Sequence, residues 1–167
     1  MTAEEITQYL EELNEELRLT NVKGEVSLFG GAVMCLAFKA RPATKDVDAI
    51  FEPVREIRNA ANRVADRHNL KVGWLNMAVK MFVVEHQRSV LLDLSNLKVF
   101  VPEGEYIFAM KVLAARADTS DIEDIQFLAD KLAIKTIEEA AAIVRNYYPN
   151  KEIKAETVFL LEELLAK

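Results

Sequence analysis

The sequence lacks several features that mark specialised classes of protein. It has a single cysteine, Cys35, which excludes an internal disulfide, and a lone thiol in an apolar stretch is typical of a reducing compartment. No uninterrupted apolar run approaches the length of a membrane span, and no secretory signal opens the chain. Repeats and low-complexity tracts are absent as well. We therefore expect a cytoplasmic protein with no membrane partner.

The residues that are present suit one domain with a substantial core. The chain has 167 residues, and its hydrophobic fraction of 51% and charged fraction of 29% are ordinary for a globular protein. Its net charge of −6 argues against a dominant nucleic-acid surface, while a local basic groove stays compatible with that charge. No feature of the sequence indicates an oligomeric state.

Hydrophobic periodicity predicts strands together with helices in the first part of the chain and helices alone in the rest. A single α+β domain is expected, with an α/β core over residues 1–101 and a helical portion over residues 102–167. Residues 74–82 fit either a short helix or part of a strand. The acidic residues of the first helix, Glu11, Glu12, Glu15 and Glu16, are interpreted as a solvated face. The expected strands are 25–29, 46–51, 89–94 and 97–101, and the expected helices are 2–17, 31–38, 53–68, 103–117 and 155–165, with two more that begin at Ser120 and Thr136.

The stretch over residues 28–51 carries most of the chemical information. A β-rich run leads into Gly30 and Gly31, a short helix follows, and a second strand opens with Asp46 and Asp48 on either side of a valine. Residues two apart in a strand point to the same face, so the two carboxylates are expected side by side with the valine in the core. Neighbouring carboxylates repel unless a cation lies between them, and carboxylate oxygens suit Mg²⁺.

The glycine pair strengthens the interpretation of the two aspartates as a metal site. Glycine lets the backbone approach a ligand closely, and the start of the following helix offers N–H groups to a phosphate. A phosphate-binding turn and metal-binding acids in one supersecondary unit together indicate a site for a nucleoside triphosphate with Mg²⁺. The simpler alternative is that Asp46 and Asp48 only terminate a strand, because aspartate is common at strand ends and a lone Asp-x-Asp is a weak motif.

These residues resemble the signature of the polymerase-beta-like nucleotidyltransferase superfamily, in which a Gly-Gly turn, a short helix and a strand with Asp-x-Asp follow one another. Gly30-Gly31 with the run Thr44-Lys45-Asp46-Val47-Asp48 is similar to the small members found among toxin–antitoxin nucleotidyltransferases and to a related, largely uncharacterised bacterial family. The resemblance covers about residues 26–165. It implies transfer of a nucleoside monophosphate from an NTP to an acceptor hydroxyl on a tRNA, a protein or a small molecule.

The resemblance also assigns roles within this stretch. It implies Mg²⁺ or Mn²⁺ at Asp46 and Asp48, with the triphosphate close to the backbone of Gly30 and Gly31. Lys45 is then a phosphate contact, and Thr44 either bonds the nucleotide or caps the turn.

Nucleotidyl transfer usually needs a third carboxylate, which places a metal or takes the proton of the attacking hydroxyl. Asp93 is the candidate, because it lies near the end of the apolar run 90–94 and is expected to point opposite to Leu92. The alternative for Asp93 is an ordinary acid at a strand end or turn, close to Asn96.

A late helical segment adds further charged residues. Lys111 lies in an apolar helix and must find water or an anion. The segment resembles one in the toxin-like nucleotidyltransferases, which implies that Lys111 contacts nucleotide phosphate and Asp121 completes the site, with Arg116 and Asp124 as companions. The alternative is that Arg116 pairs with Asp121 or Asp124 to fix one helix against the next.

The segment 74–80 is similar to a motif of the uncharacterised relatives, in which an acid often follows the asparagine. Here Met77 follows Asn76, and Lys80 is expected either to hold triphosphate or to be a surface lysine. If the missing acid is the catalytic one, the chain is a silent relative that binds nucleotide without turning it over. Such a chain would act as a binding or antitoxin-like module.

Overall fold

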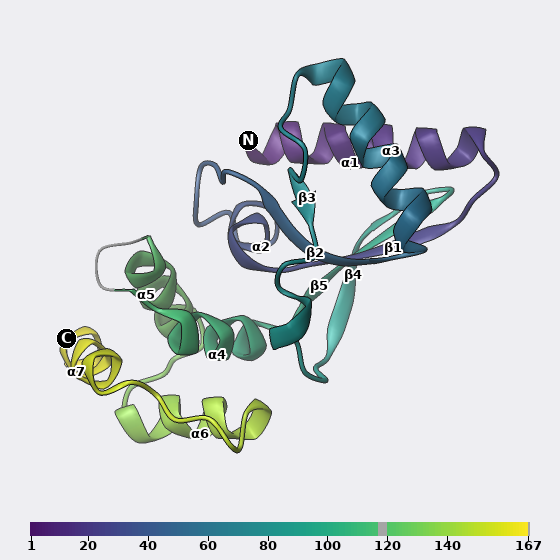
Figure 1. Cartoon of the computed structure of the whole chain (residues 1–167). Helices are drawn as coiled ribbons and strands as arrows, with labels where there is room; N and C mark the ends of the chain where they lie inside the picture. Colours follow the sequence, from purple (N-terminus) through teal and green to yellow (C-terminus); the bar gives the residue numbers. More distant parts are fainter. Residues whose placement is uncertain (117–119, 167) are drawn as a thin grey trace. The chain divides into compact units, whose positions relative to one another are not determined.

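The computed structural model describes residues 1–116 and 120–166, and these fall into two units (Figure 1). Unit 1 comprises Met1–Val83 and Arg88–Pro102 and contains the sheet. Unit 2 comprises Val84–Gln87 and the chain from Glu103 onward, and its regular elements are helices. Because a mixed sheet is followed by a helical half, the predicted α+β class is confirmed.

Unit 1 is built on a mixed sheet with the strand order β3-β2-β1-β5-β4. The central strand β1 pairs antiparallel with β2 and parallel with β5. At the edges, β3 runs parallel to β2 and β4 runs antiparallel to β5. The end of β1 therefore lies beside the start of β2, which brings the glycine pair to the two aspartates. The strands are β1 (Gly24–Leu28), β2 (Val47–Glu52), β3 (Leu75–Asn76), β4 (Arg88–Asp93) and β5 (Leu97–Pro102).

One face of the sheet belongs to the core of unit 1. Val26 pairs with Phe51 and Leu28 with Ala49, and all four side chains are buried, so they point to the same side. Two helices, α1 (Ala3–Leu19) and α3 (Val54–His68), pack against each other on one side of the sheet (Figure 1). The alternate residues of β1 and β2 point to the other face, and they include Ser27, Asp48 and Ile50. We call this face the Asp48 face.

The predicted start of the first helix is confirmed. The side chain of Thr2 accepts a hydrogen bond from the Glu5 backbone, and the Glu5 carboxylate accepts one from the Thr2 backbone. This capping box satisfies N–H groups that the first turn leaves without helical partners.

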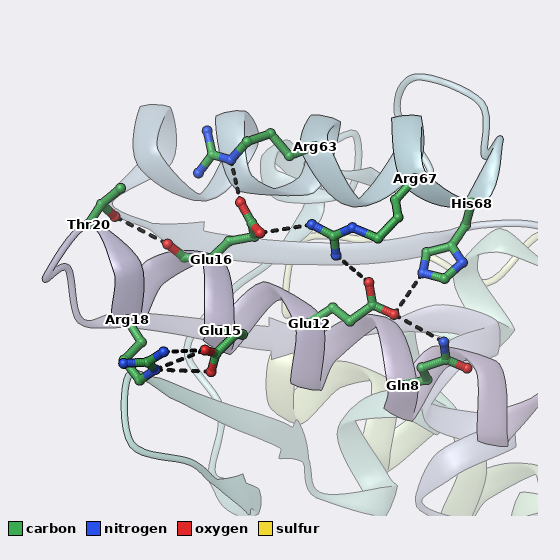
Figure 2. A network of polar contacts seen from close by, with 9 residues as sticks. All are labelled: Gln8, Glu12, Glu15, Glu16, Arg18, Thr20, Arg63, Arg67 and His68. Atoms are coloured by element: carbon green, nitrogen blue, oxygen red, sulfur yellow. Dashed lines mark hydrogen bonds and ion pairs between the residues drawn. The ribbon is translucent and has the colours of Figure 1, made fainter.

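Two glutamates of α1 turn toward α3 and form a network of ion pairs (Figure 2). Glu16 accepts hydrogen bonds from Arg63 at 2.5 Å and from Arg67 at 2.8 Å. Glu12 accepts one from Arg67 and lies 2.7 Å from His68 Nε2. The glutamate side chains are only 12% and 21% exposed. The interpretation of this pair as solvated surface is therefore wrong, because the cations of α3 cover it.

The network shifts the titration of both glutamates. The hydrogen bond from Arg63 is the largest of the causes that hold the pKa of Glu16 below its ordinary value. Burial acts to raise the pKa of Glu12, but hydrogen bonds from Gln8, Arg67 and His68 outweigh it, so that the pKa of Glu12 is also lowered. Both carboxylates thus favour the folded state in their charged form.

In unit 2, each helix packs against a helix that is next to it in the sequence or separated from it by one helix. Helix α4 contacts both α5 and α6, and α6 contacts α7. The ring of Tyr106 in α4 stacks on His86 at 4.1 Å between centroids, and its hydroxyl lies 2.8 Å from the Tyr148 hydroxyl. Burial raises the pKa of Tyr148 well above its ordinary range. The helices are α4 (Gly104–Ala114), α5 (Asp121–Lys131), α6 (Ile137–Tyr147) and α7 (Ala155–Leu165).

Most element boundaries differ from the predicted ones by only a few residues. Residues 74–82 contain both alternatives, since the two-residue strand β3 is followed by the 3-10 helix η1 (Lys80–Phe82). The helix predicted over 103–117 ends at Ala114 in α4, and residue 117 lies outside the described residues. Among the residues that the structure describes, no helix has both the length and the apolar character that crossing a membrane requires.

Candidate functional site

The carboxylate of Asp48 lies against the backbone of Gly30. The Phe29 N–H donates to the Asp48 carbonyl at 2.9 Å, which holds the start of β2 beside the glycine turn. Gly30 has a φ of +60°, in the left-handed region that glycine adopts without steric cost. A Cβ atom on Gly30 would lie 2.8 Å from Asp48 Oδ2, which is too close for that contact. Gly30 therefore permits both the turn and the close approach of Asp48.

Gly31 is crowded by different side chains. A Cβ atom there would lie 2.5 Å from Thr44 Oγ1 and 2.7 Å from Arg41 Nη1. The space that the two glycines leave is thus occupied by side chains of this protein. The glycine turn gathers a carboxylate, a hydroxyl and a guanidinium around a few residues of backbone.

The predicted alternation around Val47 is present. Val47 is fully buried, whereas Asp46 and Asp48 on either side of it are partly exposed, as expected for two acids that share the face opposite to the core. Asp46 precedes β2, and its Oδ2 lies 3.9 Å from Lys71 Nζ in an ion pair whose side chains are both substantially exposed. Such a pair holds the carboxylate weakly and leaves it able to bind a stronger cation.

The loop that carries Thr44 is anchored to the start of the chain. The Thr44 N–H donates to the Met1 carbonyl at 2.9 Å, and Thr2 forms an isolated bridge with Ala43. The Thr44 hydroxyl donates to the carbonyl of Asp46 at 3.3 Å, which fits the predicted role of a turn cap. Lys45, the other predicted contact in this loop, has an exposed side chain.

Asn76 is the neighbour of Asp48 on the edge strand β3. The two residues are partners in the parallel register of β2 and β3. The Asn76 amide donates to the Gly73 carbonyl at 3.2 Å, and its Oδ1 accepts from Ala78 N at 3.1 Å, so that the side chain shapes the turn toward η1. Lys80 opens η1 and is exposed.

Asp93 lies at the other end of the sheet. It pairs with Lys98 of β5, which is the neighbour of Glu25 in β1, and Glu25 is opposite Glu52 at the end of β2. Asp48 is near the opposite end of β2, about 13 Å away at ~3.3 Å per residue. Asp93 instead lines a cavity of about 540 Å³ together with Glu25, Glu52 and Lys98. A third carboxylate would have to lie beside Asp46 and Asp48. The structure does not bring Asp93 there.

The predicted nucleotide contacts of the helical segment lie in unit 2. Lys111 Nζ of α4 is 3.3 Å from Asp121 Oδ1 and 2.9 Å from Asp124 Oδ2, both in α5. The side chains of Lys111 and Asp124 are 11% and 4% exposed. Lys111 thus finds its anion within the protein and ties α4 to α5. Arg116 follows α4 with an exposed side chain, and its predicted contact with nucleotide stays a prediction.

Arg41 is the site residue that the sequence did not single out. No motif in the sequence marks it, because nothing in the spacing of a loop arginine relates it to a glycine ten residues earlier. The signal that could have found it is the Arg41-Pro42 break after the short helix, which returns the chain toward the turn.

The residues around the glycine turn suit a cation that arrives with a nucleotide. In the part of the chain that the structure describes, no group of three or more histidine, cysteine, aspartate or glutamate residues is placed to hold a metal. Mg²⁺ usually binds through one or two carboxylates and completes its shell with water and substrate phosphates. In such a site, Asp46 and Asp48 would supply the protein's ligands and the triphosphate would supply the rest.

Comparison with protein families gives a match over residues 4–158 to a family described as "Nucleotidyltransferase of unknown function (DUF6036)". This match spans most of both units. No curated protein matches the chain.

Proposed function

The chain belongs to this nucleotidyltransferase family, and from that premise we propose that it transfers a nucleoside monophosphate from an NTP to an acceptor hydroxyl, with Mg²⁺ or Mn²⁺. The observation that carries the proposal is the approach of the Asp48 carboxylate to the Gly30 backbone. It joins a metal-binding acid to the turn that the superfamily resemblance associates with phosphate.

Each residue of the turn has a role in this proposal. Asp46 and Asp48 hold the cation, which when bound offsets negative charge on the α-phosphate. Thr44 and Arg41 lie at Gly31, where a hydroxyl and a guanidinium suit phosphate oxygens. Lys45 and Lys80 are exposed cations that would meet the outer phosphates. In the reaction, the acceptor oxygen bonds to the α-phosphorus and its proton passes to water. The bond between the α-phosphorus and the oxygen shared with the β-phosphate breaks, and pyrophosphate leaves with that oxygen.

A second candidate function is a silent relative that binds nucleotide as a regulatory or antitoxin-like module. Two observations favour it. Met77 follows Asn76, where the resemblance implies an acid, and Asp93 lies at the far end of the sheet. The proton of the acceptor hydroxyl then has no third carboxylate beside the aspartate pair to receive it among the described residues.

Label transfer separates the two functions. The full chain is incubated with each α-phosphate-labelled NTP and Mg²⁺, together with tRNA, with protein extract, or alone, and both label transfer and pyrophosphate are measured. The proposal predicts transfer with the natural chain and with Asp66→Asn, an exposed control on α3, and a loss of about 100-fold or more with Asp48→Asn. The acceptor pool that takes the label identifies tRNA, protein or small molecule.

The silent module predicts a different outcome. NTP binding would then depend on Asp46 and Asp48, while none of the candidate acceptors becomes labelled and no pyrophosphate is released. Binding that is unaffected by Asp46→Ala and Asp48→Ala would place the nucleotide at another site and contradict both functions.

A further inference from the structure

The Asp48 face of the sheet also carries the guanidinium of Arg88. Ser27 of β1 pairs with Ile50 of β2 and with Phe100 of β5. Because paired residues point to the same side, and Asp48 is two residues from Ile50, these side chains share one face. Arg88, at the start of β4, extends over this face.

Arg88 is held there by three contacts. Its Nη1 donates to Ser27 Oγ at 2.8 Å, and its Cζ lies 3.6 Å from the centroid of the Phe100 ring. Its Nη2 is 3.9 Å from Glu25 Oε1. The side chain therefore crosses β5 and brings a guanidinium to the central strand. A stacked guanidinium keeps its planar fork in a fixed orientation.

The charge of Arg88 is only partly satisfied by these contacts. The ion pair with Glu25 is long, and both side chains are about two-fifths exposed, at 41% and 42%, so it contributes little. Within the described ranges, Ser27 is the residue that accepts a hydrogen bond from the Arg88 side chain. The other N–H groups of the fork are left for water or for a ligand.

The position of Arg88 relates it to the aspartate pair. Ser27 is directly opposite Ile50, so Ser27 and Asp48 are diagonal neighbours whose Cα atoms are about 7–8 Å apart. A carboxylate that holds a cation and a guanidinium that holds phosphate oxygens then face the same side of the sheet, close enough for one chain of phosphates to reach both.

We propose that Arg88 binds a phosphate of the triphosphate on the Asp48 face. This assignment rests on the proposed function and adds a substrate-binding residue to it. Arginine suits the position because its fork makes paired hydrogen bonds to phosphate, which a lysine at the same place cannot reproduce.

The competing explanation is that Arg88 only ties β4 to β1. In that case Arg88→Gln lowers the stability of the protein but leaves phosphate binding by the folded protein unchanged. Binding constants measured on protein that is shown to be folded by circular dichroism therefore separate the two roles.

The test measures binding of tripolyphosphate and of an NTP by calorimetry, with Mg²⁺ and with chelator. Arg88→Gln is expected to weaken both by about tenfold or more, and Arg88→Lys by less. Arg58→Gln, an exposed arginine on α3, is the matched control and should bind like the natural chain. The effect of Arg88→Gln persists in chelator, whereas that of Asp48→Asn requires Mg²⁺.

The possible failures are distinguishable. Unchanged binding by folded Arg88→Gln would overturn this assignment and leave the proposed function intact. If Arg88→Gln does not fold, Ser27→Ala releases the guanidinium from β1, and its failure to weaken tripolyphosphate binding would overturn the assignment equally. Absence of NTP and tripolyphosphate binding by the natural chain would contradict the proposed function and this assignment together.

Discussion

The position of the Asp48 carboxylate depends on the absence of a side chain at Gly30. The positive φ of Gly30 turns the chain out of β1, and the missing side chain leaves room for the Asp48 carboxylate. The glycine pair was interpreted from the sequence as space for a ligand. The structure adds that side chains of the protein occupy this space, so the turn orders the carboxylate and the guanidinium. The approach of a phosphate to the turn stays a prediction.

Replacing Gly30 by alanine should damage both stability and binding. An alanine with positive φ costs about 1–2 kcal/mol, and its Cβ would also displace Asp48 Oδ2. We expect a stability loss of at least this size in urea unfolding, together with loss of metal-dependent NTP binding.

Gly73→Ala is the control for this prediction. Gly73 has a φ of +86°, but a Cβ there would meet nothing within 4 Å. It should show the backbone cost alone and bind NTP normally. Equal stability and equal binding in the two variants would contradict a contact between Gly30 and Asp48.

The ion pairs of Lys111 with Asp121 and Asp124 can be tested by a single substitution. Removing the charge of Lys111 leaves two carboxylates of α5 together in a nearly buried position, so Lys111→Met should lower the free energy of unfolding by about 3–5 kcal/mol. Lys135→Met, at an exposed position, should be neutral. A stable Lys111→Met protein with weakened NTP binding would instead support the phosphate contact that the resemblance implies.

At the scale of elements, local patterns predicted more than long-range ones. The alternation of Asp46, Val47 and Asp48 has period two, and the final helix was predicted with the bounds that α7 has. The two-residue strand β3 was ambiguous, because so short a strand is defined by its pairing with β2 rather than by its own sequence. Arg88 carries no motif, and only the register of β4 with β5 brings it to the Asp48 face.

The contact between α1 and α3 predicts a specific pH dependence. The pKa of Glu16 is lowered in the folded state, so its contribution to stability is present above the ordinary value of 4.5 and is lost as pH falls through the folded pKa. Glu16→Gln should therefore cost about 1 kcal/mol near neutral pH and almost nothing in strong acid.

Urea unfolding at neutral and acidic pH measures this difference. Glu11→Gln, an exposed position on the same helix, is the control and should change little at either pH. A penalty for Glu16→Gln that is the same at both pH values would argue against the ion pairs with Arg63 and Arg67.

In the whole molecule, the residues that the sequence predicted for the site and the proposed Arg88 divide between the two units. The glycine turn, the aspartate pair and Arg88 belong to unit 1, whereas Lys111 and its carboxylate partners belong to unit 2. Strand alternation alone could not reveal that Asp93 lies at the far end of the sheet, because that depends on pairings between β4, β5 and β1. The prediction of one catalytic domain with a helical portion stays a prediction.

We propose that Asp46 and Asp48 bind a divalent cation together with a nucleotide's phosphates. Electron paramagnetic resonance of Mn²⁺, titrated into the full chain with a non-hydrolysable NTP analogue, tests it most directly. We expect Mn²⁺ binding that requires the nucleotide, is retained in Asp66→Asn, and is lost in Asp48→Asn. Equal nucleotide-dependent Mn²⁺ binding by Asp48→Asn and the natural chain would contradict it.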